Sequence, residues 1–159
     1  MEILSKINKP LYGIAGNHDE WARLPFDDVR TVFRKTGGDW LTDTDVLAAN
    51  GRVELTGSSC KTPLLPAVSR ATPAKRILMV HYPEFVDTIS DRHFDLILAG
   101  HTHGGQVRLP FIGGLIDLGH YEKGLYRTAA GPFYVNPGLG TFYHDMRFFC
   151  RPEVTIIEL

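Results

Sequence analysis

Three short apolar runs of this chain each lead directly into a polar segment that carries histidine. The runs are residues 11–15, 77–80 and 96–99, and the histidines that follow them are His18, His81 and His101. Apolar runs of four or five residues, bounded by polar turns, are typical of strands buried in a sheet. In open α/β sheets, ligands bind at the carboxyl ends of the strands. We therefore expect a mixed α/β fold in which these histidines converge at one edge.

The rest of the sequence predicts one helix, one hairpin and a second half rich in short strands. Apolar residues recur at helical spacing from Val29 to Phe33, and Gly37-Gly38 should end that helix. Asn50-Gly51, which lies between two apolar runs, predicts a hairpin with a tight primed turn. Further strands are expected at residues 106–109, 125–127, 133–135 and 154–157. Residues 57–74 are rich in Ser, Thr and Pro and predict a long loop.

Composition excludes several classes of protein. The length of 159 residues suits one domain, and 17 basic residues against 18 acidic ones give a net charge of −1. This balance argues against wrapping of nucleic acid by bulk charge and against a polybasic membrane binder. The first ten residues have no signal-peptide pattern, so the chain as given is expected to be cytoplasmic. Cys60 and Cys150 are expected to be reduced, partly buried thiols.

The segment Gly100-His101-Thr102-His103-Gly104 has the composition of a metal site. If this segment is extended, the two imidazoles point the same way, and the flanking glycines let the backbone fold closely around an ion. Imidazole nitrogen together with amide and carboxylate oxygen suits divalent Mn, Fe, Zn or Ni. Three other histidines are expected to be ordinary hydrogen-bonded residues: His93, His120 and His144.

Three motifs follow one another along the chain: Gly16-Asn17-His18-Asp19, His81 and Gly100-His101-Thr102-His103. In this order they resemble the second half of the calcineurin-like metallophosphoesterase signature. The chain is also similar to the bacterial membrane-associated branch of that superfamily, in the segments 100–110, 124–127, 138–140 and 147–153. The resemblance therefore covers nearly the whole chain. It implies a partial phosphoesterase domain over residues 1–159, the C-terminal part of an αββα sandwich with mixed sheets.

The resemblance also implies roles for individual residues. Asn17, His81 and His101 correspond to ligands of one metal, and His103 to a ligand of a second. His18 corresponds to the histidine that meets the phosphate and the leaving group, and Asp19 would orient it. Two metals can clamp a phosphate and activate water. The implied reaction is hydrolysis of a phosphomonoester, a phosphodiester or a lipid-linked pyrophosphate, such as a UDP-linked acyl glucosamine.

Residues that shape the substrate site are less well defined by the sequence. Arg108, Arg127 and Arg147 are candidate phosphate contacts, because guanidinium groups bind phosphate oxygens in pairs. For any one of them, an ordinary surface or salt-bridged role is the more common case. Residues 57–74 and 111–123 are expected to shape the cleft around the substrate.

The sequence departs from the family pattern in one respect. The family's Asp-x-His and Gly-Asp-x-x-Asp motifs, which supply most ligands of one metal and the bridging carboxylate, are absent, since residues 1–11 contain neither Asp nor His. Asn17, His81 and His101 could still hold a single metal. The chain is thus expected to be a fragment of a longer product, one half of a split protein, or a degenerate relative.

Alternatives from other classes stay open at this stage. The missing bridging carboxylate favours a non-catalytic metal-binding or interaction module. Nucleic-acid processing is a weaker alternative, and the charge balance gives it no support. If the true N-terminus lies upstream of Met1, a membrane anchor or an export signal could precede this chain.

Overall fold

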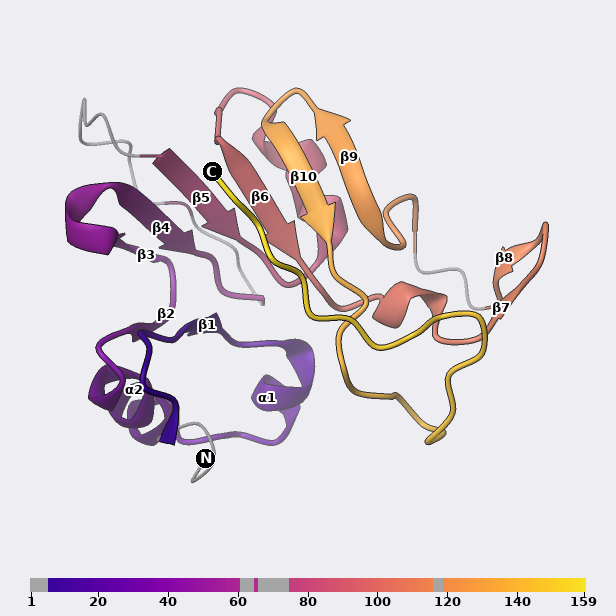
Figure 1. The fold of residues 1–159 in the computed structure, drawn as a ribbon, viewed down its shortest axis with the longest axis horizontal. Helices are drawn as coiled ribbons and strands as arrows, with labels where there is room; N and C mark the ends of the chain where they lie inside the picture. Colours follow the sequence, from indigo (N-terminus) through magenta and orange to yellow (C-terminus); the bar gives the residue numbers. More distant parts are fainter. Residues whose placement is uncertain (1–5, 61–64, 66–74, 116–118) are drawn as a thin grey trace. The chain divides into compact units, whose positions relative to one another are not determined.

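The computed structural model describes residues 6–60, 65, 75–115 and 119–159. The chain divides into two compact units, Met1–His81 and Tyr82–Leu159 (Figure 1). Both units combine short strands with a few helical turns, so the expected mixed α/β class is confirmed. Most of the loop expected at residues 57–74, and residues 116–118 of the expected cleft segment, lie outside the described residues.

In the first unit, a two-stranded parallel sheet packs against a helix. β1 (Tyr12–Ile14) pairs with β2 (Asp39–Leu41), and the chain between them forms α1 (Asn17–Trp21) and α2 (Phe26–Lys35). On α2, Val29 and Phe33 are buried, and the Phe33 ring meets the Trp40 ring edge-on at a centroid distance of 5.1 Å. The predicted first strand and helix are therefore confirmed, with the apolar face of α2 as the core contact.

The first unit also contains three strands in mixed pairing. β3 (Thr44–Ala48) is antiparallel to β4 (Val53–Gly57), which is parallel to β5 (Lys75–Met79). The predicted hairpin is confirmed, but its turn is longer than the tight turn that Asn50-Gly51 predicts. The ladder ends at the pair Ala48 and Val53, and the turn η2 (Ala49–Gly51) has positive φ at all three residues. The Ala49 carbonyl accepts the Arg52 N–H, which closes this wider turn.

Three strands form the core of the second unit. β6 (Leu96–Ala99) is parallel to β10 (Gly131–Val135), which is antiparallel to β9 (Gly124–Thr128). Ile97, Phe133 and Val135 are fully buried along these strands. The 3₁₀ helix η3 (Pro83–Ile89) adds Val86 and Ile89 to the buried set. The strand predicted at residues 96–99 is therefore confirmed, together with its buried character.

A smaller substructure follows β6 in the second unit. The turn η4 (His103–Gly105) leads into β7 (Arg108–Leu109), which pairs with β8 (Gly113–Gly114). Val107 also bridges to Phe148, so a distant segment lies beside this hairpin. The hairpin extends away from β9 and β10 (Figure 1).

The strand predicted at residues 154–157 is wrong. Residues 151–159 form no strand, and the segment is attached near β10 by one backbone bond, from the Glu153 N–H to the Gly138 carbonyl (3.2 Å), and by side chains. Asn136 Nδ2 donates to Thr155 Oγ1 at 2.9 Å, and the Tyr134 hydroxyl donates to the Glu153 carboxylate. Val154 and Ile156 face the opposite way and are exposed. The alternating pattern in the sequence is therefore satisfied by side-chain hydrogen bonds on one face.

The cysteines and the lengths of the helices are the next features to consider. Cys60 and Cys150 are both buried and are not joined in a disulfide, as predicted. Within the described ranges, no helix is both long enough and apolar enough to cross a membrane.

The attachment of the C-terminal segment predicts a titration behaviour for Glu153. The hydroxyls of Thr155 (2.6 Å) and Tyr134 donate to its carboxylate and lower its pKa. A lowered pKa contributes stability above the unfolded-state pKa, and this stability is lost as pH falls through the folded-state value. We expect a carboxyl NMR titration to place Glu153 below its ordinary pKa, and Tyr134→Phe to raise the midpoint. An unchanged midpoint in Tyr134→Phe would contradict this attachment.

Candidate functional site

Asn17 and His81, which lie 64 residues apart in the sequence, meet in the first unit. Asn17 is buried and begins α1, directly after β1, and His81 follows β5 by two residues. The imidazole Nε2 of His81 lies 2.7 Å from Oδ1 of Asn17, so the Nε2–H tautomer donates to the amide oxygen. Two of the expected metal ligands are therefore in direct contact at the ends of their strands.

Gly16 makes this contact possible. A Cβ atom at Gly16 would lie 2.8 Å from Cε1 and 3.1 Å from Nδ1 of the His81 ring, which is closer than side chains pack. The backbone of Gly16 is extended, with φ of −99°, so its conformation is open to any residue. Glycine is therefore required here by the space that the His81 ring takes up.

The two residues expected to act on the phosphate, His18 and Asp19, lie in the first turn of α1. The Asp19 carboxylate accepts the Gly16 N–H at 2.8 Å and so caps the helix. His18 is exposed, and its ring meets the Trp21 ring edge-on with centroids 4.8 Å apart. Asp19 thus fixes the backbone from which His18 projects, while the catalytic roles of both residues stay predictions.

His101 and His103 lie in the second unit, on the turn that follows β6. We call residues 101–106 the histidine turn. This turn is not extended, because φ is +68° at His101, +50° at His103 and +42° at Gln106. Positive φ at a residue other than glycine costs on the order of 1–3 kcal/mol. The common direction expected of two imidazoles on an extended segment therefore does not apply. His101 packs edge-on against Tyr82, with ring centroids 4.5 Å apart.

Two buried polar side chains hold this strained turn. The Thr102 hydroxyl donates to the backbone carbonyl of Glu122 at 2.5 Å. The Gln106 amide nitrogen donates to the carbonyls of Phe142 (2.9 Å) and His144 (3.0 Å), and its oxygen accepts the Phe142 N–H at 2.6 Å. Since both side chains are nearly inaccessible to water, the loss of either set of bonds would leave buried polar groups unsatisfied.

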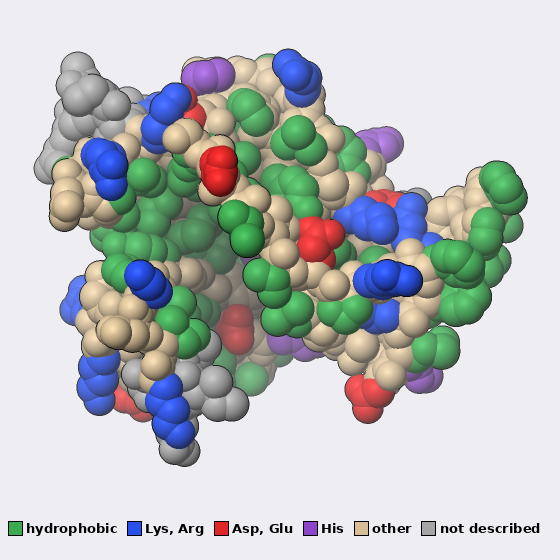
Figure 2. Space-filling view, in the orientation of Figure 1, with side chains coloured by type: hydrophobic (Ala, Val, Ile, Leu, Met, Phe, Trp, Pro, Cys, Tyr) green, Lys and Arg blue, Asp and Glu red, His purple; other side chains and the backbone are tan. Residues whose placement is uncertain are grey.

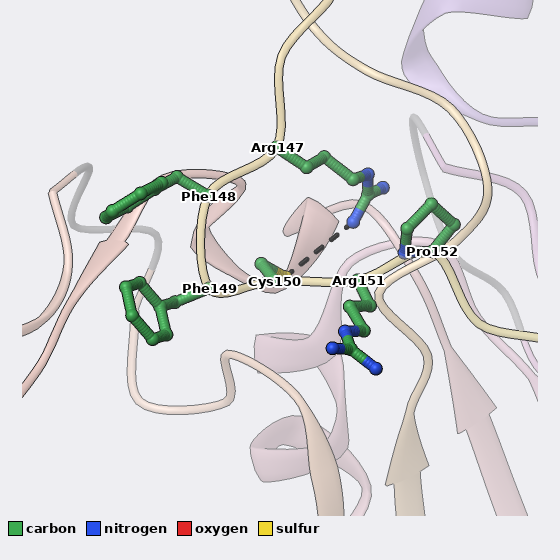
Figure 3. Close-up of a pocket in the computed structure, with 6 residues that line it drawn as sticks. All are labelled: Arg147, Phe148, Phe149, Cys150, Arg151 and Pro152. Atoms are coloured by element: carbon green, nitrogen blue, oxygen red, sulfur yellow. Dashed lines mark hydrogen bonds between the residues drawn. The ribbon is translucent and has the colours of Figure 1, made fainter.

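Arg147 and Cys150 hold the same turn from a distant segment. Arg147 donates to the carbonyls of His103 (Nη1, 3.2 Å), Pro137 (Nη2, 2.7 Å) and Gly140 (Nε, 2.9 Å). The Cys150 thiol donates to the His103 carbonyl at 3.3 Å and lies 3.7 Å from Arg147 Nη1 (Figure 3). The donors of Arg147 are therefore directed at backbone carbonyls, which makes it a support of the turn.

The other two candidate phosphate contacts differ from Arg147 and from each other. Arg108 donates to the Gly104 carbonyl at 3.1 Å and forms an ion pair with Glu122. Arg127 is exposed on β9. A phosphate contact stays a prediction for all three arginines, and the bonds described here favour a structural role for Arg108 and Arg147.

A cavity of about 370 Å³ is lined by residues 147–152. Figure 3 shows the rings of Phe148 and Phe149 on one side of this segment and the guanidinium groups of Arg147 and Arg151 on the other. Because Arg147 and Cys150 also bind the His103 carbonyl, the cavity adjoins the support of the histidine turn.

Sequence reasoning did not assign the supporting roles of Thr102, Gln106 and Cys150. Their partners are mostly far away in the sequence; the bonds from Gln106 to Phe142 and from Cys150 to His103 span 36 and 47 residues. The glycine-rich sequence of this turn could have indicated that supporting side chains are needed. A chain that bends sharply beside two histidines needs buried donors to satisfy its carbonyls.

The donor atoms present can be tested against a divalent metal ion. Two ligand atoms about 2.1 Å from one ion lie about 3 Å apart at a right angle and about 3.4 Å apart in the tetrahedral geometry of zinc. Asn17 Oδ1 and His81 Nε2 lie 2.7 Å apart, at hydrogen-bond distance, so they would separate slightly to share an ion, and both atoms suit borderline metals. Among the described residues, no group of three or more His, Cys, Asp or Glu side chains could hold a metal. The fit is therefore to part of one ion's ligand set.

Carboxylate ligands for a second ion are not grouped with the histidines in the described part of the chain. The role of His103 as a ligand of a second ion therefore stays a prediction.

Comparison with known proteins gives an independent line of evidence. Phosphodiesterase YaeI of Escherichia coli (strain K12) is 32% identical over 94% of this chain and 58% of its own length. The uncharacterized metallophosphoesterase YkoQ of Bacillus subtilis (strain 168) is 29% identical over 95% of this chain and 62% of its own length. A second such protein of that organism, YkuE, is 42% identical over 52% of this chain and 30% of its own length.

Two other comparisons found nothing: no protein-family model and no solved structure matches the chain. The chain spans about three fifths of YaeI and YkoQ, and the matches to both cover nearly all of it. These matches include the segments that carry Asn17, His81 and the histidine turn. Over the part of those proteins that it covers, the chain is similar to proteins named metallophosphoesterase or phosphodiesterase along nearly its whole length.

Proposed function

We propose that this chain carries the second part of the active site of a divalent-metal-dependent phosphoesterase. One observation supports this most directly. In a chain whose relatives are named for phosphodiester or phosphoester hydrolysis, Asn17 Oδ1 and His81 Nε2 lie 2.7 Å apart at the ends of their strands. We assign Asn17, His81 and His101 to one ion and leave His103 as a ligand of a second.

When bound, a divalent ion supplies charge that neutralises phosphate oxygens and makes water a better nucleophile at neutral pH. The residues of this chain then have defined tasks. His81 would hold such an ion through the lone pair of Nε2, which requires the ring proton to be on Nδ1. His18 is exposed beside Asn17 and can donate a proton to the departing oxygen. Asp19 positions His18 by capping α1.

We propose a phosphodiester as the class of substrate. Within the wider class of phosphoesters, we propose a lipid-linked phosphoester as the more specific substrate. The name of the E. coli relative is that of a phosphodiesterase. A net charge of −1 gives no support for nucleic acid as the partner. A second candidate is a non-catalytic metal-binding module, because Asn17 and His81 supply two ligand atoms and residues 1–11 lack the motifs that would carry the bridging carboxylate.

Hydrolysis of an aryl phosphodiester with Mn²⁺ tests the proposal. In the longest form of the protein that its reading frame encodes, we expect His81→Ala and His101→Ala each to lower kcat/KM by about 100-fold or more, because a lost ligand weakens metal binding and misplaces the phosphate. His120→Ala, which changes an exposed histidine outside the motifs, is the matched control. Activity that survives both ligand substitutions would contradict the proposal, and stoichiometric metal binding without turnover would favour the second candidate.

Gly16→Ala tests the geometry rather than the ligand chemistry. The added methyl group would push the His81 ring away from Asn17, so we expect Mn²⁺ affinity to fall about tenfold or more in calorimetric titration. Gly140→Ala is the control, because a Cβ there meets no atom within 4 Å. Equal Mn²⁺ affinity in Gly16→Ala and the unsubstituted protein would show that the close approach of His81 is irrelevant to metal binding.

Arg147→Lys tests the support of the histidine turn. Lysine cannot reach three carbonyls with one flat group, so the backbone amides of Gly104 and Gln106 should exchange with deuterium about tenfold faster, and kcat should fall. Arg151→Lys, in the same segment, should leave exchange at the turn unchanged. If Arg147→Lys raises KM alone and exchange stays the same, Arg147 contacts the substrate as first expected.

A further inference from the structure

An exposed apolar surface lies at the β7–β8 hairpin of the second unit. We define the hairpin patch as Phe111, Ile112, Leu115, Phe148 and Phe149. Phe111 is fully exposed at the turn between the strands, Ile112 is 72% exposed and Phe149 is 66% exposed. Figure 2 shows hydrophobic side chains gathered over this hairpin.

The members of the hairpin patch lie together because two segments are joined by backbone bonds. The Arg108 N–H donates to the Phe148 carbonyl at 2.9 Å, and the Phe148 N–H donates to the Gln106 carbonyl at 3.0 Å. The Leu115 N–H donates to the Val107 carbonyl, also at 2.9 Å. The Phe148 and Phe149 rings meet edge-on, with centroids 4.7 Å apart. The hairpin and the segment of Phe148 and Phe149 therefore lie side by side, although they are almost 40 positions apart in the sequence.

The fold of the second unit does not require these side chains. Its core is formed by residues such as Ile97, Phe133 and Val135, which are fully buried without any contribution from the hairpin tip. Contiguous apolar surface on a soluble protein is characteristic of a site that contacts a partner or a membrane. The exposure of the hairpin patch therefore indicates a partner that has an apolar region.

Charge distinguishes between possible partners. Arg147 and Arg151 flank the two phenylalanines in the sequence, and their guanidinium groups lie on the other side of the segment (Figure 3). Arg151 is exposed, whereas Arg108 is neutralised by Glu122. Exposed phenylalanine rings backed by the guanidinium group of Arg151 match the order of layers at a membrane surface, where anionic phosphates lie outside the acyl chains.

We propose that the hairpin patch inserts into the interfacial layer of a bilayer that contains anionic lipid, with Arg151 at the level of the lipid phosphates. Phe111 and Ile112 lie at the turn of a hairpin that extends away from β9 and β10, and this shape suits insertion into lipid better than capture of a peptide or a helix (Figure 1). The net charge of −1 excludes binding by bulk charge alone, so the apolar tip must carry much of the interaction. This inference does not depend on the proposed catalysis.

Co-sedimentation with phosphatidylcholine vesicles, with and without 30% phosphatidylglycerol, tests the inference. We expect the protein to bind the anionic vesicles. The double variant Phe111→Ser/Ile112→Ser should lower the partition coefficient about tenfold or more. Leu125→Ser is the matched control, because Leu125 is 68% exposed on β9 and lies outside the patch. All three positions are exposed, so the melting temperature should change little in either variant.

Arg151→Gln tests the charged part of the surface. It should reduce binding to the anionic vesicles several-fold and weaken the preference for them over neutral ones. The inference is overturned if the unsubstituted protein binds neither kind of vesicle, or if Leu125→Ser loses as much binding as the double variant. It is also overturned if sedimentation velocity shows a dimer that Phe111→Ser/Ile112→Ser abolishes, because a second copy would then cover the patch. None of these outcomes involves turnover, so the proposed catalysis is tested separately.

Discussion

The hydrogen bond between His81 and Asn17 is the contact on which the candidate site of the first unit depends. It joins the end of β5 to the start of α1 across 64 residues, and it exists because Gly16 leaves room for the imidazole ring. The capping bond from Gly16 to Asp19 fixes the same helix start. A strand end, a glycine and a helix cap thus bring an amide oxygen and an imidazole nitrogen to within 2.7 Å of each other, where both can reach one ion.

The histidine turn of the second unit depends on buried polar groups rather than on the space left by a glycine. These groups hold a strained backbone in place. His101, His103 and Gln106 all have positive φ, and bonds from Thr102, Gln106, Arg147 and Cys150 secure the backbone around them. Residues in unfavourable backbone conformations persist only where their surroundings over-determine them, and such residues concentrate at functional sites. The position of His103 is therefore set by side chains that need not touch a substrate.

Sequence reasoning succeeded where a local pattern decides the structure. The apolar runs predicted β1, β5 and β6, and the rule about strand ends predicted that Asn17 and His81 would lie near a common edge. It failed at residues 154–157, where alternation is met by bonds from Tyr134 and Asn136 rather than by a ladder. The supports of the histidine turn could not be predicted, because pairs such as Gln106 and Phe142 come together only through the tertiary fold.

¹⁵N NMR of the His81 ring during a Zn²⁺ titration tests whether the Asn17 and His81 pair binds a metal. Without metal at neutral pH, we expect the Nε2–H tautomer, since Nε2 donates to Asn17 Oδ1. With Zn²⁺, we expect loss of the Nε2 proton, protonation of Nδ1 and a shift of the Nε2 resonance, while the His120 resonances stay unchanged. A His81 ring whose nitrogen resonances and tautomer do not respond to saturating Zn²⁺ would show that this pair does not bind the metal.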